Sequence, residues 1–317
     1  MVATSRNHQI EGVQPKTTHE IELTRDGCVC ARNHVRRGYA RLTQGAYVRT
    51  HSTDNLTPDA IRRARWWALV RGVARLYEDR DIVLFGPTAL QALGVALPAR
   101  LEDWDACHVQ VVGRRPERRG VVAHRPFARG PVWRRIGGVP VLHPVDHWLQ
   151  LRGATDDELI EVGDGLLRRR RPLLTPGDLA ARLDALDRVY GVDKARRVVR
   201  WLRPGTDSLY ETRTRLVLVR AGLPCPAVNP EVWCRAAGRM YHPDMAYEAE
   251  RVAVEYDGAG HVGAVEQMDI DARRRRELQD EGWMVINVTA RQLGDPAPLV
   301  RSVEAALVLR RTHRWAA

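Results

Sequence analysis

Lysine is almost missing from this chain. Of the 317 residues only Lys16 and Lys194 are lysines, yet Lys and Arg together number 50 and the formal net charge is +11. Arginine therefore carries nearly all of the positive charge. Such a surplus favours polyanionic partners, above all nucleic acids. Because a GC-rich genome also replaces lysine by arginine, the charge supports nucleic-acid binding without establishing it.

Other absences narrow the class of protein. No stretch of 18 apolar residues occurs, and residues 1–20 lack the apolar centre of a signal peptide, so we expect a cytoplasmic protein with no membrane span. The 5 cysteines form no paired Cys-x-x-Cys frame, which favours reduced thiols over a disulfide scaffold. The chain contains no P-loop, no GxGxxG motif and no internal repeat.

The length allows two or three domains, and 44% hydrophobic with 28% charged residues is typical of a globular protein. The apolar patterns predict an α+β, multi-domain fold. We expect a polar tail at 1–18, a small winged-helix-like element and its following helix at 19–80, a mixed α/β and then helical domain at 81–203, and an α/β domain with a mixed sheet flanked by helices at 204–317. The segment PGTDS, 204–208, is typical of a linker.

Local signals predict several elements in the first 202 residues. Thr57 is expected to cap a helix whose Trp66 and Trp67 belong to the core. A strand at DIVLFG and a helix at PTALQALG follow, then CHVQVVGRR and RGVVAHR as a hairpin or strand pair. His143, Asp146 and His147 fit a strand-to-helix junction, where capping is a better reading than metal binding. The stretch 156–202 is expected to be helical.

The most informative segment is 243–261. It alternates as two short strands would, and residues 249–250 fit a two-residue turn. In that register positions whose numbers sum to 499 are opposite each other, so Asp244 faces Glu255. Like charges at this spacing destabilise a hairpin unless a cation lies between them, and the neighbouring alanines leave room. The pair predicts a site for Mg²⁺ or Mn²⁺; a solvated acidic face is the alternative.

The same register divides this ribbon into two faces. One face is apolar and consists of Met245, Tyr247, Val252 and Val254. The other consists of His242, Asp244, Ala246, Ala253, Glu255 and Asp257. Because the second strand is apolar enough to be central in a sheet, we expect another element to cover this second face.

Further motifs accompany the acid pair in a fixed order. They are S-x-x-E at 208–211, GLPCPAVNP at 222–230, PD at 243–244, VEYDG at 254–258 with His261, D-x-x-R at 271–274, and GWMVINVT at 282–289. Together, over about residues 205–293, they resemble the Vsr-like endonuclease domain of the PD-(D/E)xK restriction-endonuclease-like superfamily. The resemblance implies a helix, a three-stranded meander, a second helix and a strand that joins the sheet in parallel.

Two departures from the superfamily bear on mechanism. Asp257 stands where the superfamily usually has a lysine, and no lysine follows Lys194. The Vsr-like branch is similar in this respect and carries a downstream histidine, which implies a proton-handling role for His261; an imidazole suits that role near neutral pH. Asn287 stands where relatives often have an arginine that contacts phosphate.

The resemblance also implies roles for the acids. Asp244 and Glu255 would hold Mg²⁺ or Mn²⁺, helped by Glu211 and the Tyr256 carbonyl, and Asp257 would orient a histidine or a second ion. Glu211 has an equally good structural reading, because S-x-x-E is also a capping box.

The helix after the ribbon carries charged side chains with two readings. Asp271 and Arg274 are spaced i, i+3, so a surface ion pair is the simpler interpretation. Its arginines, Arg273 and Arg274 among them, could bind phosphates or be solvated.

The front two-thirds of the chain is similar to the AbiEi-type antitoxins of type IV toxin-antitoxin systems. The segments that carry the similarity are RRGYARLTQGAYV at 36–48, FGPTALQALG at 85–94 and VPVLHPVDHWLQL at 139–151. The first has the basic-aromatic alternation of a β-wing, with Arg36, Arg37 and Arg41 as candidate nucleic-acid contacts. The similarity implies a cognate toxin as one candidate partner.

These observations predict an Mg²⁺- or Mn²⁺-dependent endonuclease that hydrolyses or nicks DNA, with front domains for substrate engagement or regulation. Two alternatives stay open. The chain could be a non-catalytic DNA-binding regulator or antitoxin that keeps the nuclease fold as a scaffold, or it could bind or process RNA.

Overall fold

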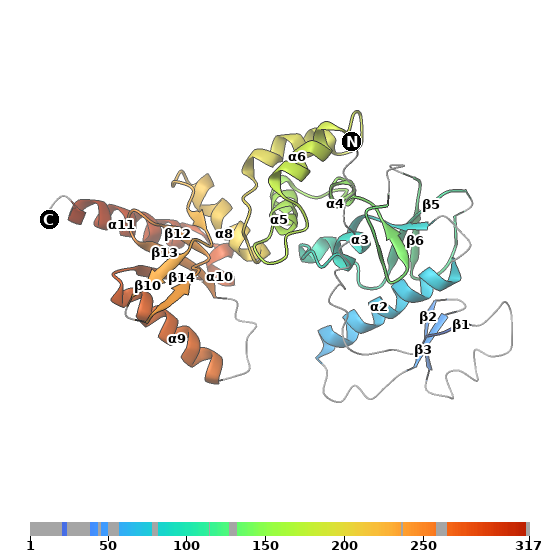
Figure 1. The fold of residues 1–317 in the computed structure, drawn as a ribbon, viewed down its shortest axis with the longest axis horizontal. Coiled ribbons are helices and arrows are strands. Elements are labelled where there is room, and N and C mark those ends of the chain that lie inside the picture. Colours follow the sequence, from blue (N-terminus) through green and yellow to red (C-terminus); the bar gives the residue numbers. More distant parts are fainter. Residues whose placement is uncertain are drawn as a thin grey trace, which may run out of the picture. The chain divides into compact units, whose positions relative to one another are not determined.

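The computed structural model describes residues 21–23, 39–43, 46–49, 57–77, 82–113, 115–126, 132–235, 237–257 and 265–314 (Figure 1). The protein is α+β, with about 46% helix, 18% strand and several small mixed sheets. It divides into two compact units: residues 1–153 with 186–193, and residues 154–185 with 194–317. None of the helices in the described residues is both long and apolar enough to cross a membrane.

The first unit begins with a three-stranded antiparallel sheet of order β1-β3-β2, formed by Ile21–Leu23, Ala46–Arg49 and Tyr39–Thr43. Strands β2 and β3 are the pair predicted within 36–49. Helix α2, Pro58–Leu76, starts at the expected cap, where the Thr57 hydroxyl oxygen accepts from the Ala60 N–H at 3.2 Å. Trp66 is buried as predicted, and its ring N–H donates to the Ala106 carbonyl at 3.2 Å. Trp67 is half-buried.

The rest of this unit is a mixed sheet with short helices. Its elements are β4 Ile82–Leu84, α3 Gly86–Ala92, η1 Ala99–Leu101, β5 Cys107–Val111, β6 Val121–His124, β7 Arg134–Ile136, β8 Val139–Val141 and α4 Pro144–Trp148. Strand β5 pairs with β4 in antiparallel and with β6 in parallel, so the two predicted strands are a pair but not a hairpin. His143 caps α4: its Nδ1 accepts from the Val145 N–H at 3.3 Å, which confirms the capping interpretation.

The predicted helical stretch contains α5 Asp156–Leu166, α6 Pro176–Asp184, α7 Val192–Val198 and η2 Val199–Trp201. Helices α5 and α6 begin with capping boxes at Thr155 and Thr175. In each box the threonine hydroxyl accepts from the backbone N–H three residues on, and the carboxylate of that residue accepts from the threonine N–H. The boundary expected at 203/204 falls inside the second unit, because α5 packs against α8, Leu209–Arg220.

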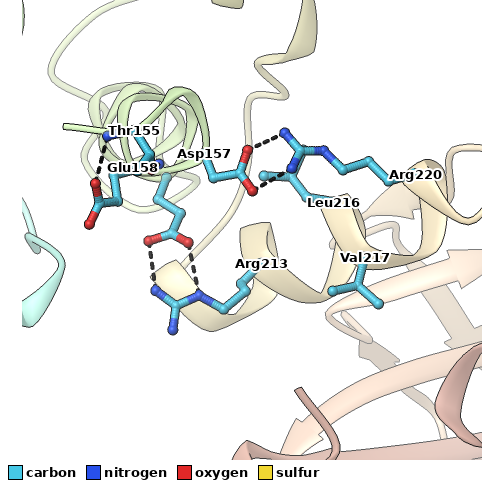
Figure 2. Close-up of a pocket in the computed structure, with 8 residues that line it drawn as sticks. Thr155, Asp157, Glu158, Arg213, Leu216, Val217 and Arg220 are labelled. Carbon is cyan, nitrogen blue, oxygen red and sulfur yellow. Dashed lines mark hydrogen bonds and ion pairs between the residues drawn. The ribbon is translucent and has the colours of Figure 1, made fainter. Parts of the chain in front are cut away.

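Ion pairs fasten α5 to α8. Glu161 receives two hydrogen bonds of 2.9 Å from Arg213, and Asp157 pairs in the same two-pronged way with Arg220. Both pairs line a pocket of about 260 Å³ between the two helices. Figure 2 shows Asp157 and Arg220 facing each other across this pocket. Deeper in the interface, the fully buried Asp164 accepts from the buried Arg215 guanidinium at 2.8 Å.

Segment 204–208 is not the linker that its composition suggests. The Gly205 N–H donates to Leu167 O at 3.0 Å, and Gly205 O accepts from the Asn229 side chain at 3.0 Å. Thr206 is buried. The prediction was wrong because glycine and proline mark a change of chain direction, whether or not tertiary contacts then hold that turn in place.

The second unit contains a four-stranded sheet of order β14-β13-β12-β9. Its strands are β9 Ala227–Val228, β12 Met245–Tyr247, β13 Val252–Asp257 and β14 Met284–Thr289. Helix α9, Val265–Asp280, precedes β14, which joins β13 in parallel as expected; α10 Ala290–Gly294 and α11 Ala297–Arg314 follow. An additional two-stranded ribbon, β10 Val232–Cys234 with β11 Arg239–Tyr241, is inserted before β12.

Each face of this sheet is covered. The predicted apolar face packs with Leu218 of α8 and with α11 in one core, whose buried strand residues are Met245, Tyr247, Val252, Val254 and Val288. On the other face, Ala246 and Ala253 are buried, and Val285, which pairs with Ala253, packs against a cluster that joins α9 to the β10–β11 ribbon. The expected cover of the acidic face is therefore α9 and this ribbon.

Candidate active site

The register predicted for the ribbon of β12 and β13 is confirmed. Met245 pairs with Val254, Ala246 with Ala253 and Tyr247 with Val252, so the paired numbers sum to 499. The turn is closed by a 3.2 Å hydrogen bond from the Arg251 N–H to Glu248 O. One step further along the ribbon, this register sets Asp244 opposite Glu255.

Asp244 is tied to both neighbouring strands. Its Oδ2 accepts from the Tyr256 N–H at 2.8 Å, and its backbone oxygen accepts from the Asn229 N–H at 2.9 Å. Burial raises the pKa of Asp244 to about 6, and the charge of Glu255 adds to this shift. The carboxylate is thus held in place next to a second acid, an arrangement that a cation would stabilise.

Glu211, at the start of α8, is 6% exposed and joins this acidic group. The Ser208 hydroxyl oxygen accepts from its N–H at 3.2 Å, but its carboxylate accepts from the Asp207 N–H at 2.9 Å and from Asn229 Nδ2 at 2.8 Å. The expected capping box is therefore only half formed. Burial, and then the charge of Asp244, raise the pKa of Glu211 to about 7. Glu211 is therefore close enough to Asp244 for the charge of Asp244 to raise its pKa.

Glu255 contacts an arginine of α9. Its Oε1 lies 2.8 Å from Arg274 Nη2 in an ion pair, and the same Nη2 donates a hydrogen bond to His242 O at 2.7 Å. The interpretation of Arg274 as half of a surface ion pair with Asp271 was incomplete, because its observed partner lies on β13; the Asp271 side chain is outside the described residues. Arg273 is exposed.

Two more polar side chains belong to the covered face. Asn287 pairs with Glu255 across β13 and β14, and its Oδ1 is buried without a hydrogen-bond partner in the described structure. His242 Nδ1 is also buried and has no hydrogen-bond partner in the described structure. Asp257 ends β13, where it is exposed. His261, Arg36 and Arg37 lie outside the described residues, as does the side chain of Arg41, so their roles stay predictions.

Sequence reasoning missed the contacts that orient the acids. Asn229 adopts a positive φ of 45°. In this conformation its backbone N–H donates to Asp244 O and its side-chain Nδ2 donates to Glu211 Oε2. An Asn directly before Pro230 is a turn signal that could have singled it out. Its partners, however, lie 15 and 18 positions away in the chain and could not be read from the turn alone.

The donor set suits a hard divalent cation. Asp244, Glu255 and the Asn287 side chain offer oxygen atoms, which Mg²⁺ and Mn²⁺ prefer. Within the described part of the chain, no three His, Cys, Asp or Glu side chains gather closely enough to hold a metal by themselves. Mg²⁺ typically takes only one or two carboxylates and completes its shell with water and substrate phosphate, so the residues fit such an ion.

We expect divalent metal to stabilise the protein, more so at alkaline pH. Glu211 and Asp244 have raised pKa values, so the native state keeps protons that the unfolded chain has lost, and stability falls as pH rises from about 4 to about 7. A cation at the site offsets this loss. At a metal concentration about 100 times Kd, the gain is about 2.7 kcal/mol. Thermal melts with and without Mg²⁺ at pH 5.5 and 8 measure it.

Asp244→Asn is the matched variant for this measurement. It should abolish most of the metal-induced rise in Tm at pH 8. If the wild type melts at the same temperature with and without metal, or if the variant shows the same metal-induced rise in Tm, then Asp244 does not bind the metal.

Comparison with known proteins yields distant relatives only. Two uncharacterized proteins of Mycobacterium tuberculosis, MT2308 and Rv2248, are each 29% identical to this chain over 99 residues. The match covers 31% of this chain and 36% of each relative, so the chain spans about a third of their length. No protein-family model and no solved structure matches it.

Proposed function

We propose that the second unit is a divalent-metal-dependent endonuclease domain, similar to the Vsr-like branch of the PD-(D/E)xK superfamily, and that its substrate is DNA. The observation that carries the proposal is the pair of acids, Asp244 and Glu255, opposed across the β12–β13 ribbon with Glu211 beside Asp244. The strand order, with β14 parallel to β13 after α9, supports the same class.

The chain's own residues would divide the work as follows. Asp244 and Glu255 hold the cation, and the Tyr256 N–H fixes the orientation of Asp244. Asn229 fixes Glu211 in the same way. When bound, Mg²⁺ or Mn²⁺ would polarise the scissile phosphate and lower the pKa of a coordinated water. His261 takes or delivers the proton, because the usual lysine is replaced by Asp257.

The first unit would engage substrate or regulate the nuclease. Its support is the similarity of 36–48, 85–94 and 139–151 to AbiEi-type antitoxins, together with the β2–β3 pair at the predicted β-wing. A cognate toxin is the protein partner that this similarity suggests. RNA is the alternative polyanion, since the net charge of +11 does not distinguish it from DNA.

The experiment is cleavage of supercoiled plasmid with Mg²⁺ or Mn²⁺ by wild type, Glu255→Gln and the control Glu248→Gln. Glu248 is exposed in the turn of the same ribbon, so its variant removes one charge without touching the acid pair. We expect Glu255→Gln to lower the nicking rate by about 10²-fold or more, because even residues behind metal ligands cost 10–100-fold, and Glu248→Gln to leave it unchanged.

Two outcomes would contradict this function. If both variants lose the same share of the nicking rate, the activity does not depend on the acid pair. Sequence-specific DNA binding that survives EDTA, without cleavage of plasmid or RNA under any metal, would favour the non-catalytic regulator.

A further inference from the structure

Arg274 occupies the position of a cation in the candidate site. Its Nη2 lies 2.8 Å from Glu255 Oε1 and 2.7 Å from His242 O, so one nitrogen bridges a carboxylate and a backbone carbonyl. Its side chain is 28% exposed and that of Glu255 is 16% exposed, which limits screening of the pair by water. Carboxylate and carbonyl oxygens are also ligands that a hard divalent cation takes.

A metal ion and Arg274 therefore compete for Glu255. A cation held by Glu255 would lie next to the positive charge of Arg274, whose Nη2 is 2.8 Å from Glu255 Oε1. Binding of the metal would therefore displace Arg274 or take place against the repulsion of its charge. Either way, the ion pair lowers the affinity of the site for the metal.

The displaced guanidinium has a second use. Arg274 Nε and the Nε of the adjacent Arg275 are buried donors without a hydrogen-bond partner in the described structure. Buried donors that lack an acceptor are costly, and a phosphate oxygen would satisfy them. Arginine is well suited to that exchange because its planar fork binds a carboxylate or a phosphate equally well.

We propose that Arg274 couples phosphate binding to metal binding: it holds Glu255 until a phosphodiester of the substrate draws its guanidinium away, and this frees Glu255 for the metal. The inference rests on the proposed nuclease function and deepens it, since it makes the metal site sensitive to substrate. Linkage then requires that each ligand raise the affinity for the other by the same factor.

The test measures Mn²⁺ binding by the electron paramagnetic resonance of free Mn²⁺, with and without a short phosphorothioate DNA duplex. Full-length wild type is compared with Arg274→Gln and with Arg276→Gln. Glutamine at 274 keeps a polar side chain but removes the positive charge next to Glu255. Arg276 is exposed on the same helix, so its variant removes an equal charge that solvent screens.

We expect the duplex to lower the Kd of wild type for Mn²⁺ by about 10-fold, within the usual range of coupling. Arg274→Gln alone should lower this Kd by a similar factor without any DNA, and the duplex should then lower it further by a smaller factor than in wild type. Arg276→Gln should behave as wild type. If Arg274→Gln does not fold, Arg274→Met, which also removes the charge but keeps an apolar side chain of similar length, should lower the Kd for Mn²⁺ in the same direction.

Two results would overturn the coupling, and only the second would also overturn the proposed nuclease function. If Glu255→Gln loses Mn²⁺ but Arg274→Gln binds it no more tightly than wild type, Arg274 does not compete, and the nuclease proposal stands. If Glu255→Gln binds Mn²⁺ as wild type does, the metal is elsewhere and both proposals fail.

Discussion

Replacing Asp164 by alanine should lower the free energy of unfolding of the second unit by about 3–5 kcal/mol, the cost typical of breaking a buried ion pair. Asp164 is 0% exposed and accepts three hydrogen bonds: from Arg215 at 2.8 Å, from the Thr212 hydroxyl at 2.8 Å and from the Arg203 N–H at 2.7 Å. The variant leaves the Arg215 guanidinium, 1% exposed, without its counter-charge. Calorimetry of the full chain measures the loss as a fall in Tm.

Asp157→Ala is the matched control, because it breaks an ion pair in the same α5–α8 interface. Asp157 and Arg220 are 40% and 46% exposed, so this pair should contribute no more than about 1 kcal/mol. The double variant Asp164→Leu with Arg215→Met should recover much of the stability, since it leaves no buried charge. A loss in Asp164→Ala no greater than in Asp157→Ala would show that the buried pair does not hold α5 to α8.

Replacing His261 by alanine should lower the rate of DNA cleavage by about 10²- to 10⁴-fold, the range of general acid–base groups. An attacking water must lose a proton, and Asp257 stands where the superfamily that residues 205–293 resemble usually has a lysine. Plasmid nicking under single-turnover conditions measures the rate, while thermal melts with and without Mn²⁺ check that fold and metal binding persist. Cleavage unaffected by His261→Ala but lost in Glu255→Gln would assign proton transfer to the metal site alone or to Asp257.

A candidate nuclease module must also include α5 when it is isolated. A fragment that starts after residue 200 would remove Asp157, Glu161 and Asp164, and would leave Arg213, Arg215 and Arg220 without their partners. The structure therefore attaches the acidic face of α5 to the helix that carries Glu211.

The sequence by itself determined those features that depend on neighbouring residues. Alternation of apolar and polar side chains around a two-residue turn allowed one register for β12 and β13, because a slip by one residue would turn the apolar face toward the acids. Caps at Thr57 and His143 were predictable for the same reason: their partners lie two or three residues away. The opposition of Asp244 and Glu255 follows from that local register.

Only the tertiary structure decided which distant groups meet. Arg274 forms its ion pair with Glu255 rather than with a neighbour in its own helix. Asn229 donates hydrogen bonds to both Asp244 and Glu211. Strand β5 pairs with β6 in parallel. Segment 204–208 is fixed between Leu167 and Asn229 although its composition is that of a linker. Buried polar groups take whichever partner the packing of the chain brings near, and no pattern of adjacent residues specifies that partner.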